Sequence, residues 1–275
     1  MQAVYRLSWH PLHRHRVDSG YIHRMTGGQD ADQPPDEFVW PGINPVAPDA
    51  VWGWLAAGWA DLKAAPAIGL FYGGVLALMG QLLLHFVGGA VGVALTTGFL
   101  LVGPFLAIGL YDVSRRREAG ERPRLAPTLV AWRANLPAIS FYAVALTLLL
   151  AAWIRVSVVV IAVCFPEGQI DWLTPGAWTF AVTYLCVGGG LALFVFATTS
   201  LSLPLLLDRR DMDTISAAIT SFNALRQNFR PLLQFGLTIV MLTSLGFMTF
   251  RLGLVVAMPL IGHMTWHAYR ATIRA

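Results

Sequence analysis

Charged residues are scarce in this chain of 275 residues. Asp, Glu, Lys and Arg make up 12% of the sequence, whereas an average soluble domain contains roughly 25%. Hydrophobic residues make up 56%, and the mean hydropathy is +0.60. This composition excludes an ordinary soluble domain and indicates a protein that resides in a lipid bilayer.

Lysine and cysteine are also rare. Lys63 is the one lysine among 19 basic residues, and the arginines lie between the apolar stretches. The net charge of +4 therefore predicts no binding of nucleic acid. We expect the two cysteines, Cys164 and Cys186, to be buried free thiols, with a disulfide as the alternative.

Catalytic signatures are missing from the apolar stretches. These stretches contain no Walker loop, dinucleotide-binding glycine pattern, nucleophile elbow or pair of carboxylates. We therefore assign no catalytic residue and no metal ligand, and we lean towards a protein that is not an enzyme.

The chain divides into a polar tail and a membrane domain. Residues 1–47 are rich in His, Arg, Asp and Pro and lack an early apolar stretch, which predicts a disordered cytoplasmic tail without a secretory signal. Residues 48–275 predict an all-α polytopic membrane protein with six transmembrane helices in three hairpins. The predicted spans are residues 67–86, 90–111, 138–164, 177–206, 232–250 and 252–268.

Each predicted hairpin follows an amphipathic segment. Such a stripe of apolar residues is typical of a helix that lies in the membrane interface. Asp61 falls outside the first stripe, and Pro204 is expected to bend the fourth span near its cytoplasmic end. The three stripes are Trp52, Leu55, Trp59 and Leu62; Leu125, Leu129, Trp132 and Leu136; and Ile215, Ile219, Phe222, Leu225 and Phe229.

Arginines gather on one side of the predicted spans. The linkers at 112–136 and 207–230 and the two termini carry nearly all of them, so the positive-inside rule places both termini in the cytoplasm. We expect arginines on this side to contact anionic lipid headgroups. The candidates are Arg115, Arg116, Arg117, Arg209 and Arg210.

A few polar residues lie in or near the spans on the opposite side. Arg155, His85 and Arg251 could form a pocket for an anion or a lipid headgroup, with Glu167 or Asp171 as a partner for Arg155. Snorkelling or a structural ion pair is the simpler interpretation of Arg155. The run at 188–190, three glycines, suits close helix packing better than an unwound segment along a pathway.

His263 and His267 are four residues apart and share one face of a helix. Two such imidazoles could bind a metal ion or a haem, although the pattern is not that of a zinc protease. We favour a structural role at the cytoplasmic interface, beside Trp266, Tyr269 and Arg270, and keep both histidines as weak candidates for a cofactor site.

Three segments of the chain resemble the DUF2189 family of bacterial integral membrane proteins. They are LLVGPFLAIGLYDVSRRREAGERP, LSLPLLLDRRDMD and PLIGHMTWHAYR, and the resemblance covers about residues 50–270. It implies a location in the bacterial inner membrane but no activity, because the function of the family is not established. Some members carry a cytochrome c oxidase label. A catalytic haem-copper subunit, however, would be expected to have six histidines in the membrane. This chain has His85, His263 and His267 near its spans.

Three functional hypotheses follow. The first is a non-enzymatic accessory, scaffold or lipid-binding and partner-binding membrane protein that needs no cofactor. The second is a transporter or channel for a small solute or lipid, with Arg155 and residues 188–190 at its pathway. The third is an accessory subunit of a respiratory oxidase or a haem-binding protein. The expected partners are the bilayer and either another membrane complex or a second copy of the chain.

Overall fold

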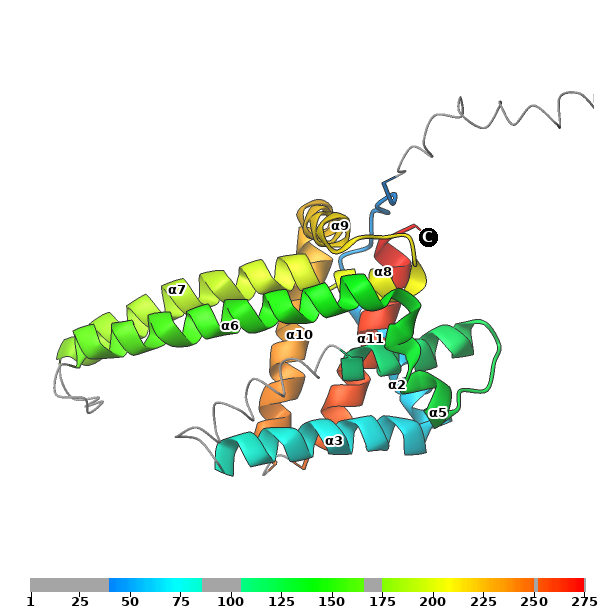
Figure 1. Cartoon of the computed structure of the whole chain (residues 1–275), viewed down its shortest axis with the longest axis horizontal. Coiled ribbons are helices and arrows are strands. Elements are labelled where there is room, and N and C mark those ends of the chain that lie inside the picture. Colours follow the sequence, from blue (N-terminus) through cyan, green and yellow to red (C-terminus); the bar gives the residue numbers. More distant parts are fainter. Residues whose placement is uncertain (1–39, 86–104, 166–174, 250–251, 275) are drawn as a thin grey trace, which may run out of the picture. The chain divides into compact units, whose positions relative to one another are not determined.

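A computed structural model describes residues 40–85, 105–165, 175–249 and 252–274. The regular elements in these ranges are helices, in agreement with the predicted all-α class. Residues 105–118 are also helical. The labelled elements in Figure 1 and their neighbours are α2 (Ala50–Ala64), α3 (Pro66–His85), α5 (Leu125–Thr128), the 3-10 helix η1 (Ala131–Asn135), α6 (Leu136–Cys164), α7 (Pro175–Thr199), α8 (Ser202–Asp208), α9 (Thr214–Gln227), α10 (Phe229–Met248) and α11 (Leu254–Thr272).

The described part of the chain contains fewer membrane-spanning candidates than the sequence predicts. The regions Leu125–Cys164, Gly176–Asp208 and Phe229–Met248 are long and apolar enough to cross a bilayer. Helices α2 and α3 would form a fourth crossing if the pair, bent by 104°, acts as one span. Most of the predicted second span lies outside the described residues, so six spans are not confirmed.

Helix α11 is the central helix of the described structure. It packs most extensively against α2 and α3 and also contacts α10. Its buried side chains include Met264, Trp266 and Tyr269, which are at most 1% exposed. Helix α11 is not among the helices of the described ranges that qualify as spans. The stretch predicted as the sixth span is therefore surrounded mainly by protein.

Glycines allow the neighbouring helices to approach α11 closely. A Cβ atom on Gly58 of α2 would lie 2.9 Å from the backbone nitrogen of Met264. A Cβ atom on Gly73 of α3 would overlap the backbone oxygen of Val255. This oxygen lacks its usual helical donor, because Pro259 has no N–H four residues later. The small glycines thus set the distance at which α2 and α3 pack on α11.

Helices α6 and α7 form an antiparallel pair that extends away from α11 (Figure 1). Helix α7 continues without a break through residues 188–190. A packing role holds for Gly188, where a Cβ atom would lie 2.7 Å from the Trp153 ring, but a Cβ atom on Gly189 or Gly190 would meet no atom within 4 Å. Both cysteines are free thiols, but Cys186 is exposed. Its predicted burial was wrong, because the outer surface of α7 faces away from the protein core.

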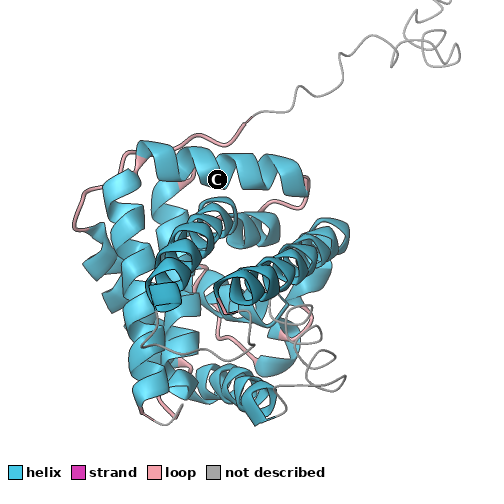
Figure 2. Ribbon diagram, turned by 90° about the vertical axis from the view of Figure 1, so that its left-hand side faces the viewer, coloured by secondary structure: helices cyan, strands magenta, loops and turns pink. Residues whose placement is uncertain are grey.

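The α6–α7 pair and the α10–α11 pair run in different directions. Helices α6, α7 and α3 lie along one direction, whereas α10 and α11 run across it, as Figures 1 and 2 both show. Helix α7 meets α10 where Phe196 packs against Phe235, with ring centroids 6.0 Å apart. The predicted arrangement of three similar hairpins is not confirmed by these helices.

The three predicted amphipathic segments are at least partly helical. Helices α2 and α9 are present, but the second segment is divided into α5, η1 and the start of α6. The face of α2 that packs inward carries Trp54, Gly58 and Asp61, none of which belongs to the predicted stripe. In α9 the small residues Ala217 and Ala224 are buried, and the bulky apolar residues of the predicted stripe point outward, except Leu225.

The described residues near the two ends of the chain lie side by side. The backbone N–H of Arg274 donates to the oxygen of Gly42, and the N–H of Asn44 donates to the oxygen of Thr272, each at 2.8 Å. The compact unit accordingly begins at Pro41. The predicted disorder of the tail concerns residues that lie almost entirely outside the described ranges.

We predict that Gly73→Ala destabilises the protein. The added methyl group forces α3 away from α11, which should cost about 1–3 kcal/mol and lower the melting temperature in detergent, followed by tryptophan fluorescence. Gly74→Ala is the matched control, because a Cβ atom there meets no other atom within 4 Å and alanine favours a helix. Equal melting temperatures for the two variants would contradict the close contact between α3 and α11.

Candidate functional site

A set of charged and polar side chains surrounds the second half of α11. They come from α2, from residues 105–118, from α8 and from α11 itself, so they connect segments that are far apart in the sequence. We call this set the α11 network. Its members are Asp61, Ser114, Arg117, Glu118, Asp208, His263, Trp266, His267, Tyr269 and Arg270.

Asp61 joins three helices within the α11 network. Its side chain is 7% exposed. One carboxylate oxygen accepts a hydrogen bond from Arg117, and the other lies 2.8 Å from Nε2 of His267. A buried carboxylate needs such partners, since an unpaired charge away from water is costly. Asp61 therefore fixes α2 and residues 105–118 to α11.

His263 and His267 are held by different partners. The Nδ1 atom of His263 lies 2.8 Å from the hydroxyl of Ser114, and the ring is fully buried. Its Nε2 atom has no hydrogen-bond partner among the described residues. His267 is instead paired with Asp61. In the described ranges, no group of three or more His, Cys, Asp and Glu side chains is placed to hold a metal ion.

Two further carboxylates complete the α11 network. Glu118 accepts hydrogen bonds from Nε1 of Trp266 at 2.9 Å and from Nε of Arg270 at 3.0 Å. Asp208 accepts one from the Tyr269 hydroxyl at 2.7 Å. Burial, followed by the charge of Asp208, raises the pKa of Tyr269, so that the phenol keeps its proton and continues to donate. These contacts tie residues 105–118 and α8 to the end of α11.

The arginine run at 115–117 is bound to carboxylates of the protein. Arg115 and Arg116 donate through Nε to the buried carboxylate of Asp112, at 3.0 and 2.7 Å. Arg117 pairs with Asp61. The side chains of Arg115, Arg116 and Arg117 are 31%, 28% and 29% exposed. The sequence held a signal for the first two pairs, because Asp112 precedes Arg115 and Arg116 by three and four residues on one helix.

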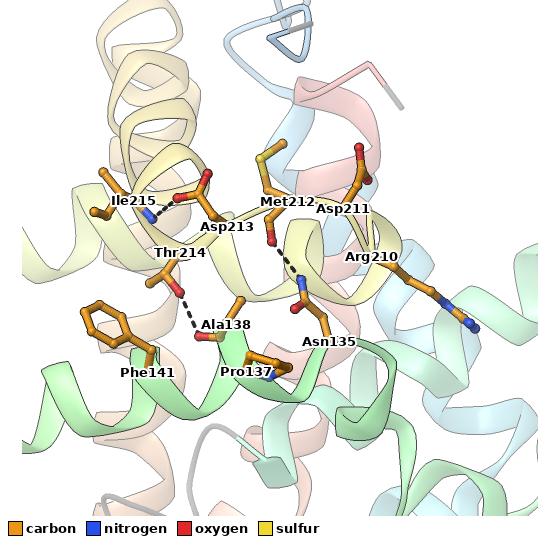
Figure 3. Close-up of a pocket in the computed structure, with 10 residues that line it drawn as sticks. All are labelled: Asn135, Pro137, Ala138, Phe141, Arg210, Asp211, Met212, Asp213, Thr214 and Ile215. Carbon is orange, nitrogen blue, oxygen red and sulfur yellow. Dashed lines mark hydrogen bonds between the residues drawn. The ribbon is translucent and has the colours of Figure 1, made fainter. Parts of the chain in front are cut away.

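The other predicted lipid-contact arginines lie near the turn between α8 and α9. Arg209 donates from Nη2 to the backbone oxygen of Arg274 at 3.3 Å. Arg210 is exposed and lines a pocket of about 430 Å³ between this turn and the start of α6 (Figure 3). In that pocket the Thr214 hydroxyl donates to the oxygen of Ala138 at 2.8 Å, which fastens α9 to α6.

Asp213 in the same pocket caps α9. Its Oδ1 accepts hydrogen bonds from the backbone N–H groups of Ile215 and Ser216, at 2.8 and 3.0 Å (Figure 3 shows the first). Hydrogen bonds from Ser216, and then from Ile215, hold the pKa of Asp213 below its ordinary value. The carboxylate therefore stays charged and fixes the start of α9.

The polar residues predicted on the opposite side are only partly described. Arg155 lies on the exposed surface of α6, and no ion pair holds it among the described residues. His85 ends α3, and its side chain lies outside the described part, as do Arg251, Glu167 and Asp171. The predicted anion or headgroup pocket therefore stays a prediction.

Aromatic side chains lie near Arg155 on α6 and α7. Seventeen residues separate it from Ala138, which corresponds to about 26 Å along a helix, and the hydrocarbon core is about 30 Å thick. Trp153 and Tyr184 are in contact nearby, with ring centroids 4.9 Å apart, and Trp178 is 78% exposed. Tryptophan and tyrosine are typical of the headgroup level, which an arginine side chain can reach by snorkelling.

The larger cavities are apolar. One of about 760 Å³ lies between α6 and α7, and another of about 460 Å³ lies between these helices and α9. The two cavities share Leu146, Leu149 and Thr199, so they are adjacent. Neither is lined by a member of the α11 network, whose side chains are engaged with one another.

We predict that Asp61→Asn destabilises the protein strongly. The substitution keeps the shape of the side chain but removes the counter-ion of Arg117. The cost should be roughly 2–4 kcal/mol, somewhat below that of a fully buried pair, because Arg117 and His267 are 29% and 24% exposed. The melting temperature in detergent measures this effect. Asp49→Asn, at an exposed position without a side-chain cap, is the control and should change little.

Comparisons with known proteins bear on the membrane assignment. No curated protein and no solved structure matched the chain. The model of the DUF2189 family, described as a predicted integral membrane protein, matches residues 92–208. This range contains the arginine run, helices α6 and α7, and α8. The resemblance of the chain to the DUF2189 family of predicted integral membrane proteins is thereby confirmed over residues 92–208.

Proposed function

We propose that this membrane protein is a non-enzymatic scaffold that binds anionic lipid at the cytoplasmic surface of the bacterial inner membrane. The observation that carries the proposal is the outer face of α9 and of the first turn of α10, which combines exposed apolar side chains with exposed arginines. We call this face the α9 surface. It consists of Ile215, Ile219, Phe222, Arg226, Phe229 and Arg230.

The composition of the α9 surface suits a membrane interface. Ile215 and Phe229 are 65% and 52% exposed, although α9 is attached to the protein through its small residues. Arg226 and Arg230 are exposed and form no ion pair within the described ranges. Apolar side chains that enter the acyl chains beside arginines that meet phosphates are typical of interfacial helices. Anionic phospholipid is therefore the ligand that we assign to the α9 surface.

The α11 network supports a scaffold over an enzyme or a haem protein. Its carboxylates each accept hydrogen bonds from side chains of other helices, and their main effect is to cross-link those helices. His267 is engaged with Asp61, and His263 with Ser114. Continuous helix at 188–190 and the outward position of Arg155 likewise give no particular support to a transport pathway.

The adjacent ends of the described chain support one orientation for both termini. The hydrogen bonds between Gly42 and Arg274 and between Asn44 and Thr272 support the same side of the membrane for these two segments. The arginine-rich linkers favour the cytoplasm for that side. A scaffold in this orientation presents the α9 surface to the anionic cytoplasmic leaflet. The protein partner is another membrane complex or a second copy of the chain.

Lipid binding in mixed nanodiscs tests this function. Purified protein in discs of phosphatidylglycerol and phosphatidylethanolamine should retain phosphatidylglycerol preferentially when released and measured by native mass spectrometry. Each arginine near an anionic surface contributes about 1 kcal/mol, so the double variant Arg226→Gln with Arg230→Gln should reduce this preference about tenfold or more.

Charge-preserving substitutions provide the control for this experiment. The double variant Arg226→Lys with Arg230→Lys should keep most of the preference, since an ammonium group still attracts phosphate. An unchanged preference in the glutamine variant would contradict lipid binding by the α9 surface. Loss in both variants together with a lower melting temperature would also contradict it, because the arginines would then act on folding.

A further inference from the structure

The direction in which α6 and α7 run indicates how the membrane is oriented. These helices carry exposed apolar side chains along most of their length, including Phe141, Leu148, Val163, Leu185 and Phe194. Such surfaces are stable only in hydrocarbon. The 29 residues of α6 measure about 43 Å, which exceeds the thickness of a bilayer core, about 30 Å. The α6–α7 pair therefore lies along the direction that crosses the membrane.

Helix α10 runs across this direction. Figure 1 shows α10 along its length beside α6 and α7, and in Figure 2, turned by 90°, α6 and α7 are seen end-on while α10 keeps its direction. The contact of Phe196 with Phe235, and the 3.2 Å that would separate a Cβ on Gly236 from the Phe196 ring, hold the crossing in place. A helix transverse to a membrane-crossing pair lies along the membrane plane.

The side chains of α10 fit this position. One face is buried against the protein and includes Leu232, Phe235 and Thr238. The opposite face is exposed and apolar. A helix that packs on protein with one face and exposes an apolar face on the other fits the interface, where the apolar face meets the acyl chains. The exposed large apolar residues of α10 are Phe229, Leu233, Leu237, Val240, Met241, Leu245, Phe247 and Met248.

Helix α11, which follows α10, carries the ionic contacts of the α11 network. Asp61, Glu118 and Asp208 all contact its second half. Charges at the centre of a bilayer are expensive, and the cost disappears if the helix lies at or above the headgroup level. The position of α11 beside the transverse α10 places these carboxylates there.

We infer that α10 and α11 do not form a transmembrane hairpin: α10 lies in the cytoplasmic interface with its apolar face against the acyl chains, and α11 returns on the same side. This goes beyond lipid binding by the α9 surface and does not depend on it. The partner of the apolar face of α10 is the hydrocarbon of the bilayer itself. The turn between α10 and α11 then faces the cytoplasm, whereas a hairpin would place it outside.

Labelling of single cysteines distinguishes the two topologies. In a background of Cys164→Ser and Cys186→Ser, Thr249→Cys marks the exposed end of α10. Asp211→Cys, between α8 and α9, marks the cytoplasmic side, and Glu167→Cys, between α6 and α7 in the sequence, marks the opposite side. A membrane-impermeant maleimide is applied to spheroplasts and to inverted vesicles. We expect Thr249→Cys to react in inverted vesicles at least tenfold more than in spheroplasts, as Asp211→Cys does.

The opposite pattern would overturn the inference. Reaction of Thr249→Cys in spheroplasts, as for Glu167→Cys, would show that α10 crosses the membrane. Reaction from neither side, with full reaction after denaturation, would also contradict it, because residue 249 would lie within the hydrocarbon. Each variant is first required to keep the melting temperature of the unmodified chain in detergent, so that a folding defect is not read as topology.

Discussion

The enclosure of α11 is the constraint on which the rest of the described structure depends. Glycines at 58 and 73 let α2 and α3 reach its backbone, and Asp61 then comes within hydrogen-bond distance of His267. The close approach and the ionic contact support each other. A larger residue at Gly58, which lies in the same helix as Asp61, would move the carboxylate away from its partners, and loss of the carboxylate would leave Arg117 with a poorly compensated charge.

The sequence predicts which segments are helical and apolar better than it predicts what surrounds them. Helices α3, α6, α7 and α10 lie where apolar stretches were expected, since about 20 apolar residues suffice for a span. Helix α11 has a similar pattern but is covered by protein, and hydropathy does not distinguish a lipid neighbour from a protein neighbour. The apolar stripes of α2 and α9 were recognised from the sequence. Which way each stripe faces depends on which side of the helix, through its small residues, packs against the protein.

The candidate site was only partly accessible to sequence reasoning. His263 and His267 were recognised by their spacing, and the arginine run by its charge. Asp61 was missed because its partners lie 56 and 206 residues further along the chain. Arg117 was expected to contact lipid, but its pairing with Asp61 makes it part of a structural ion pair. The α9 surface, in contrast, keeps its arginines free of ion pairs in the described structure, which is why the proposed lipid site lies there.

A double-mutant cycle between Asp61 and His267 tests most directly whether α11 is held at the centre of the protein by its ionic contacts. Asp61→Asn, His267→Gln and the double variant are compared with the unmodified chain through their unfolding free energies in detergent. Residues in direct contact within one network show coupling energies of about 0.5–3 kcal/mol. The account predicts a value in this range, with the double variant less destabilised than the sum of the single variants. Additive effects would contradict it.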